Sequence, residues 1–136
     1  MAEVVAKHQA AASSVDLRIE SFGIGSWHEG EGMDPRARRA LETAGYVDHG
    51  HLARGISAQR LADFDLLVVA DRSHERDLKR FLDGQSDAAV VLLRSFDDAA
   101  DDLELADPYY GDQQDFERCL EEIESAVDGL LAQLLG

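Results

Sequence analysis

Hydrophobic and polar positions follow two different patterns along the 136 residues. Residues 15–22 alternate between apolar and polar side chains, which is the spacing of a strand with one buried face. Residues 65–70 and 88–93 are nearly continuous apolar runs, which are typical of strands buried on both faces. The pattern therefore predicts three strands.

Helical patterns flank and separate these strands. Asp34 followed by Pro35 is a typical helix start, because the aspartate caps the first turn and proline fits inside it. Gly45 stands where such a helix commonly ends. The last segment of the chain has apolar residues at every third or fourth position, which indicates a helix with one buried side. We expect helices over residues 1–12, 34–45, 57–64, 73–81 and 115–135.

Strands that alternate with helices are joined by right-handed crossovers into a parallel sheet with helices on both faces. We therefore expect one domain, residues 1–136, of the three-layer α/β/α class. Ligands bind such sheets beyond the carboxyl ends of the strands. The loops at residues 23–32, 71–74 and 95–111 each follow a predicted strand, so they are expected to meet at one rim.

Charge and composition limit the partners and the compartment. The formal net charge of −15 argues against nucleic acid or an anionic membrane surface as a partner. The apolar runs are too short to cross a bilayer, and the first residues show no secretory signal. The single cysteine, Cys119, has no partner for an internal disulfide and fits a reducing compartment. We expect a cytoplasmic protein with neither a nucleic-acid nor a membrane partner.

The candidate chemistry lies at residues 107–111, which read Asp-Pro-Tyr-Tyr-Gly. A carboxylate beside two tyrosines suits general-acid catalysis on an aromatic leaving group. Such an acid needs a nucleophile as its partner. Cys119 is a poor one, because the glutamates around it raise the pKa of a thiol. These residues therefore carry one half of a catalytic apparatus.

The remaining polar clusters predict neither a metal site nor a bound cofactor. His49 and His51 stand two residues apart, but no cysteine or third histidine follows at metal-ligand spacing. The acidic run between residues 97 and 104 lacks the glycine and the terminal glutamate of a calcium loop, so we interpret it as a solvated loop. Arg36 and its neighbouring arginines are interpreted as a surface salt-bridge face.

Several stretches of the chain stand in a distinctive order. They are Met1-Ala2-Glu3, residues 21–28, Asp34-Pro35-Arg36-Ala37, His51-Leu52-Ala53-Arg54, residues 64–67, Asp71-Arg72-Ser73-His74, residues 93–97 and residues 107–112. Together they resemble the low-molecular-weight protein tyrosine phosphatases, particularly the actinobacterial type. The resemblance covers essentially the whole chain, and the last stretch is its most specific motif.

The resemblance implies a fold, a reaction and a set of site residues. The fold is that family's three-layer parallel α/β structure. The reaction is hydrolysis through a phosphocysteine, in which Asp107 protonates the departing tyrosine and then activates water. Trp27, Tyr109 and Tyr110 would line the substrate cleft, and His51 would support the phosphate-binding loop. The expected substrate is a phosphotyrosine protein or an aryl phosphate.

The sequence also departs from the family pattern. The family's first central strand and its Cys-x5-Arg loop would stand before the position of Met1, and these 136 residues contain neither. We therefore expect an N-terminally incomplete phosphatase domain, through a misassigned start, a shortened chain or a natural short form. Without the nucleophilic cysteine and the phosphate-binding arginine the chain is expected to be inactive. The alternative is a non-catalytic module that binds phosphotyrosine or assembles, and open sheet edges would favour a homo-oligomer.

Overall fold

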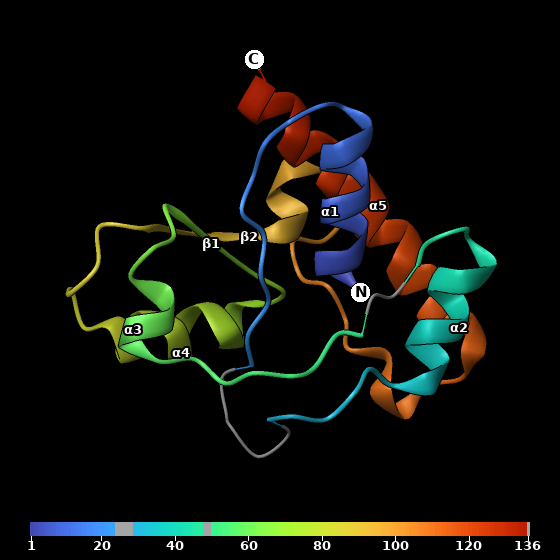
Figure 1. Ribbon diagram of the computed structural model, residues 1–136, viewed down its shortest axis with the longest axis horizontal. Coiled ribbons are helices and arrows are strands. Elements are labelled where there is room, and N and C mark those ends of the chain that lie inside the picture. Colours follow the sequence, from blue (N-terminus) through green and yellow to red (C-terminus); the bar gives the residue numbers. More distant parts are fainter. Residues whose placement is uncertain (24–28, 48–49, 136) are drawn as a thin grey trace.

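The computed structural model describes residues 1–23, 29–47 and 50–135 (Figure 1). Trp27 and His49 lie outside the described residues. The elements in chain order are α1 (Ala2–Ala12), α2 (Pro35–Thr43), α3 (Ala58–Leu61), β1 (Leu66–Val69), α4 (Arg72–Leu82), β2 (Ala89–Leu92), the 3₁₀ turns η1 (Leu93–Phe96) and η2 (Pro108–Tyr110), and α5 (Gln113–Leu135).

Local signals in the sequence account for where the helices begin. Asp34, Ser57 and Asp71 precede α2, α3 and α4. Each side chain accepts a hydrogen bond from a backbone N–H two or three residues further on, at 2.8 to 3.0 Å. Such caps satisfy amides that have no partner inside the helix. The predicted helices are confirmed, with ends that move by a few residues.

The sheet of the described chain consists of two parallel strands. β1 and β2 pair in register from Leu66 opposite Ala89 to Val69 opposite Leu92. Helix α4 connects them and packs on both strands. The α/β class with a parallel sheet and a helical crossover is therefore confirmed.

The strand predicted over residues 15–22 is wrong. These residues run without regular structure, and the nearest backbone pairing is an isolated bridge between Gly23 and Gly55 (Figure 1). The apolar alternation is only partly used, because Val15 and Ile19 pack on the core whereas Leu17 is 39% exposed. A strand requires a neighbouring backbone to complete its ladder of hydrogen bonds. Among the described residues no strand pairs with this segment to supply that ladder.

Two hydrophobic clusters form the interior of the described residues. The larger cluster surrounds α5 and includes side chains of α1 and α2. The smaller cluster joins β1 and β2 to α3 and α4. Residues 15–22 contribute to both, since Val15 and Ile19 pack on the larger cluster and Phe22 on the smaller one.

Helix α5 holds the larger cluster together. It contacts α1, α2 and η1, and Ile123 and Val127 on its inner side are almost completely buried. At Gly129 the helix approaches η1 so closely that an added Cβ would stand 1.9 Å from the carbonyl oxygen of Phe96. No helix in the described part of the chain is long and apolar enough to cross a membrane.

Candidate active site

Asp107 begins a tight turn whose shape follows from the sequence. Its carboxylate accepts a hydrogen bond from the backbone N–H of Tyr109 at 3.0 Å, and Pro108 occupies the first position of η2. The N–H of Gly111 then closes the turn on the carbonyl of Pro108 at 2.8 Å. Aspartate and proline favour such turns, because one accepts from the backbone and the other presets its own φ angle.

The two tyrosines of the turn lie at the surface. Tyr109 is 54% exposed and Tyr110 is 97% exposed. Their rings meet edge to face, with centroids 5.0 Å apart and an angle of 86° between the planes. The structure therefore places the predicted acid Asp107 beside a pair of exposed aromatic rings.

Gly111 connects this turn to α5 with little space to spare. An added Cβ at Gly111 would stand 2.2 Å from a carboxylate oxygen of Asp115. That carboxylate accepts from the N–H of Asp112 at 3.0 Å, and Asp112 accepts in return from the N–H of Asp115 at 3.0 Å. This reciprocal capping box starts α5 directly behind the turn.

The loop that leads to Asp107 is anchored at the carboxyl end of β1. Leu105 donates its N–H to the carbonyl of Ala70 at 2.8 Å, and Glu104 accepts from the N–H of Arg72 at 3.1 Å. Arg94, which is buried, donates to the carbonyl of Glu104 at 3.0 Å. The meeting of the loops at residues 71–74 and 95–111 is therefore confirmed. The place of the third predicted loop, residues 23–32, beside them stays a prediction, because residues 24–28 lie outside the described residues.

Arg36 is the residue at this site that the sequence interpretation missed. The sequence pattern predicts a place on a surface salt-bridge face, but the guanidinium donates to the carbonyls of Tyr109 at 2.8 Å and Gly111 at 3.0 Å. It also pairs with Asp34 at 3.0 Å. The Asp-Pro-Arg signal locates the helix start, but only the packing of α2 beside the turn reveals this second role.

Cys119 lies in the buried side of α5. Burial raises the pKa of its thiol to about 11, the charges of Glu122 and Asp107 add to this, and the amino terminus opposes it. The expected direction, a raised thiol pKa, is confirmed, although burial rather than the neighbouring glutamates is its largest cause.

His51 lies beside α1 rather than at the turn. Its Nδ1 is 3.0 Å from a carboxylate oxygen of Glu3, and the other oxygen of Glu3 accepts the N–H of Ser21 at 2.9 Å. These contacts tie the first turn of α1 to the two segments that cross it. Whether His51 supports a phosphate-binding loop stays a prediction.

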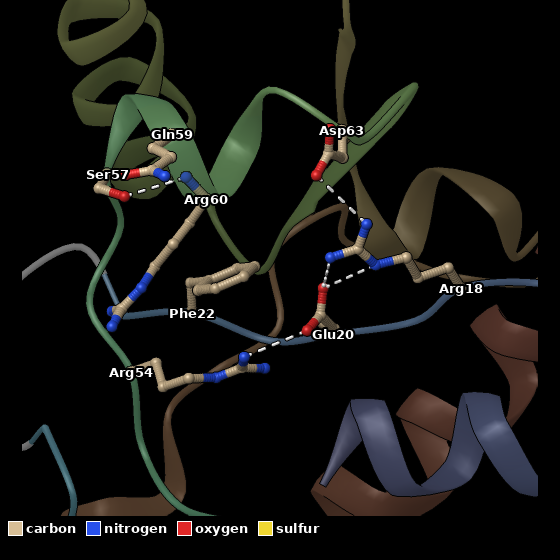
Figure 2. A pocket seen from close by; sticks show the side chains of 8 residues that line it. All are labelled: Arg18, Glu20, Phe22, Arg54, Ser57, Gln59, Arg60 and Asp63. Carbon is tan, nitrogen blue, oxygen red and sulfur yellow. Dashed lines mark hydrogen bonds and ion pairs between the residues drawn. The ribbon is translucent and has the colours of Figure 1, made fainter.

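A pocket of about 390 Å³ lies between residues 18–22 and α3, and sequence reasoning did not anticipate it. Figure 2 shows Arg18, Arg54 and Arg60 around Phe22, with Glu20 between the first two. None of its lining residues belongs to the turn at residues 107–111.

The arginines of this pocket are paired with acids. Glu20 accepts from Arg18 at 3.2 Å and from Arg54 at 3.1 Å, while Arg60 pairs with Glu29. Desolvation raises the pKa of Glu20, but the hydrogen bond from Arg54 and the two positive charges outweigh it and lower the pKa overall. Arg18, Arg54 and Arg60 are each paired with a carboxylate. The pocket therefore does not offer an unpaired positive charge to an anion.

Comparison with known proteins decides what this arrangement belongs to. Residues 1–135 match the family model described as low molecular weight phosphotyrosine protein phosphatase. This chain belongs to that family.

Individual members of the family match most of the length of this chain. A low molecular weight protein-tyrosine-phosphatase of Streptomyces coelicolor is 44% identical over 138 residues, which is 97% of this chain and 83% of the relative. Low molecular weight protein-tyrosine phosphatase A of Mycobacterium tuberculosis is 41% identical over 126 residues, 91% of this chain and 74% of the relative. The predicted relationship to phosphatases of actinobacterial type is confirmed.

The fold is that of the family as well. A crystal structure of protein tyrosine phosphatase from Entamoeba histolytica superposes with a TM-score of 0.91 at 25% identity, covering 98% of this chain and 86% of the other. The family acts on phosphotyrosine substrates, which agrees with the substrate class predicted from the sequence.

Proposed function

We propose that this chain supplies the general-acid half of a low-molecular-weight tyrosine phosphatase site, with Asp107 as the acid. The observation that carries the proposal is the turn in which the Asp107 carboxylate is held by the N–H of Tyr109 beside two exposed rings. In hydrolysis of an aryl phosphate, the carboxylic acid gives its proton to the departing phenolate oxygen. The resulting carboxylate then accepts a proton from the water that attacks the phosphocysteine.

The exposed rings suit a substrate that carries an aromatic group. Tyr109 and Tyr110 can pack against the phenyl ring of a phosphotyrosine side chain, because aromatic pairs favour edge-to-face and offset contacts. Trp27 is proposed as a further wall of the same cleft, although it lies outside the described residues. His51 is proposed to support the phosphate-binding loop from its place beside α1.

The nucleophile is the part of the reaction that these residues do not supply. Attack on phosphorus needs a thiolate and a guanidinium to hold the phosphate oxygens. Cys119 is buried, its thiol pKa is raised to about 11, and the residue six positions later is Ser125 rather than arginine. We therefore expect the 136 residues by themselves to leave aryl phosphates intact.

A second candidate function is the binding of phosphotyrosine without hydrolysis. The exposed tyrosine pair next to a site without a nucleophile favours this reading. Calorimetry with a phosphotyrosine peptide tests it, and the measured affinity should change as salt is added, because salt screens the charges of both partners. A peptide that gives no heat of binding at low salt would argue against the second candidate.

A complementation assay tests the general-acid proposal. The chain is mixed with a synthetic family segment that contains a strand and a Cys-x5-Arg loop, and hydrolysis of aryl phosphates is measured. Neither component alone should show turnover, whereas the mixture should. Turnover by the chain alone that persists in Cys119→Ser would contradict the expectation that these residues lack a nucleophile.

The choice of leaving group isolates the acid in that assay. Asp107→Asn should lower kcat for phenyl phosphate by about 10²-fold or more, because phenolate leaves poorly without a proton. The loss should be much smaller for 4-nitrophenyl phosphate, whose phenolate leaves without protonation. Asp98→Asn, an exposed change in the same acidic loop, is the matched control and should behave like the unchanged chain. Equal losses for both substrates would overturn the role of Asp107.

A further inference from the structure

Arg36 makes contacts on two elements at once. It stands in the first turn of α2, and its guanidinium reaches the turn that carries Asp107. We propose that Arg36 is a positioning residue for the general acid, which holds the turn at residues 107–111 so that the Asp107 carboxylate keeps one direction. The inference rests on the proposed function, because it takes Asp107 to be the acid.

The geometry of the guanidinium fits this task. Nη2 donates to the carbonyl of Tyr109 at 2.8 Å and Nη1 to the carbonyl of Gly111 at 3.0 Å. Nε and Nη2 also donate to the carboxylate of Asp34 at 3.2 and 3.0 Å. A planar guanidinium presents its donors in a rigid fork, so these bonds fix the turn relative to the start of α2.

Packing holds the guanidinium in place. Its central carbon lies 4.6 Å from the ring centroid of Phe116 and 5.6 Å from that of Tyr109. The carbonyl of Arg36 itself accepts from the side chain of Gln113 at 3.1 Å. Arg36 is therefore attached to α2, to the turn and to the first residues of α5.

The charge of Arg36 is already compensated, and this argues for positioning rather than substrate binding. The hydrogen bond to Asp34 raises the pKa of Arg36, and the bond from Arg36 lowers the pKa of Asp34. A guanidinium that is paired with a carboxylate and bonded to two carbonyls has few donors left for a phosphate.

Asp107 is fixed through Tyr109. The N–H of Tyr109 donates to the Asp107 carboxylate, and the carbonyl of Tyr109 accepts from Arg36. The backbone N–H of Tyr109 is therefore bonded to the acid, and its backbone carbonyl is bonded to the arginine. Upstream, Arg94 holds the carbonyl of Glu104, so the segment with Asp107 lies between two arginine anchors.

Amide hydrogen exchange measured by NMR tests the inference on the chain as it exists. In Arg36→Ala the amides of Tyr109 and Gly111 should exchange at least about ten-fold faster, because the turn opens more often. Amides of α5 around Ile123 and Val127 should keep their rates. Arg39→Ala removes the same charge from an exposed position of the same helix and should leave the turn unchanged.

Two further readouts separate positioning from general support. Arg36→Lys keeps the charge but loses the fork, so its turn amides should exchange at rates between those of the unchanged chain and Arg36→Ala. The pH-dependent chemical shift of the Tyr109 amide, which reports on the carboxylate it contacts, should lose at least half of its amplitude in Arg36→Ala. Should Arg36→Ala fail to fold, the same two measurements on Arg36→Lys decide the matter.

The contrary results are distinct. Turn amides in Arg36→Ala that exchange as in Arg39→Ala, or an equal acceleration throughout α1 and α5, would overturn the positioning role. A loosened turn combined with a harmless Asp107→Asn change in the complementation assay would overturn the acid role alone, and Arg36 would remain the residue that holds the turn.

Discussion

Cys119 is 5% exposed and lies on the side of α5 that packs in the larger hydrophobic cluster. Burial disfavours its thiolate most, and the negative charges of Glu122 and Asp107 add to this. The same residue in an exposed position at a helix N-terminus would ionise readily. Its chemistry is therefore decided by its surroundings and not by its residue type.

This environment predicts how stability changes at alkaline pH. The thiol pKa is 9.0 in the reference state and about 11 in the folded chain, so both states keep the proton well below pH 9. Between about pH 9 and pH 11 the unfolded chain ionises first, and the free energy of unfolding falls as pH rises. Urea unfolding midpoints of the unchanged chain and of Cys119→Ala, measured from pH 8 to pH 11, check this.

The comparison removes the contribution of lysines and tyrosines, which titrate in both proteins. The decrease between pH 9 and pH 11 should be smaller in Cys119→Ala. Parallel decreases in the two proteins would show that the thiol does not take part.

Helix α5 shows how one element sets the spacing of others. It starts at the capping box behind the 107–111 turn and passes α1, α2 and η1 before it ends at Leu135. Gly129 permits the close approach of η1, because any side chain there would overlap the carbonyl of Phe96. Glycine normally weakens a helix interior, so its presence here has a packing reason.

We expect Gly129→Ala to destabilise the chain, although alanine is the better helix former by about 1 kcal/mol. The added methyl group would stand against a backbone carbonyl, which moves less easily than a side chain, and overpacking costs about 1–3 kcal/mol. Urea unfolding measures the difference. Ser125→Ala, an exposed change in the same helix, is the control and should be neutral or slightly stabilising.

A gain in stability for Gly129→Ala, equal to that expected from helix propensity, would mean that η1 moves aside without cost.

At the scale of the whole molecule, the sheet edges favour self-association, whereas the net charge opposes it. Within the described residues β1 pairs with β2 alone, and Val68 in β1 is 39% exposed. Two-stranded sheets are marginally stable by themselves, and unpaired strand edges tend to pair with another chain. The formal charge of −15 opposes the approach of a second copy until salt screens it.

These opposing terms predict self-association that strengthens with salt. Sedimentation of the purified chain should show a larger average mass at about 0.5 M salt than at low salt, where the Debye length is several times greater. Val68→Lys should reduce the association, since lysine protects strand edges. Leu134→Lys adds the same charge on α5, where the side chain is 50% exposed, and should have a smaller effect. A monomer at both salt concentrations would contradict the prediction.

The helices, the strands at β1 and β2, and the family were predictable because their signals are local. Caps such as Asp34 and Asp71 act on the next few residues, and the Asp-Pro-Tyr-Tyr-Gly motif forms its turn from its own backbone. Residues 15–22 were wrongly predicted as a strand because their alternation describes burial and does not supply a neighbouring backbone.

The amino-acid sequence by itself determined the helices, the strands β1 and β2, the candidate acid Asp107 and the lack of a second cysteine, since each depends on neighbouring residues or on composition. Only the tertiary structure decided that Arg36 bonds the turn and that Cys119 is buried in the larger hydrophobic cluster. Arg36 and Gly111 are 75 residues apart in the chain. Contacts over such separations arise from how helices pack, which no short sequence pattern encodes.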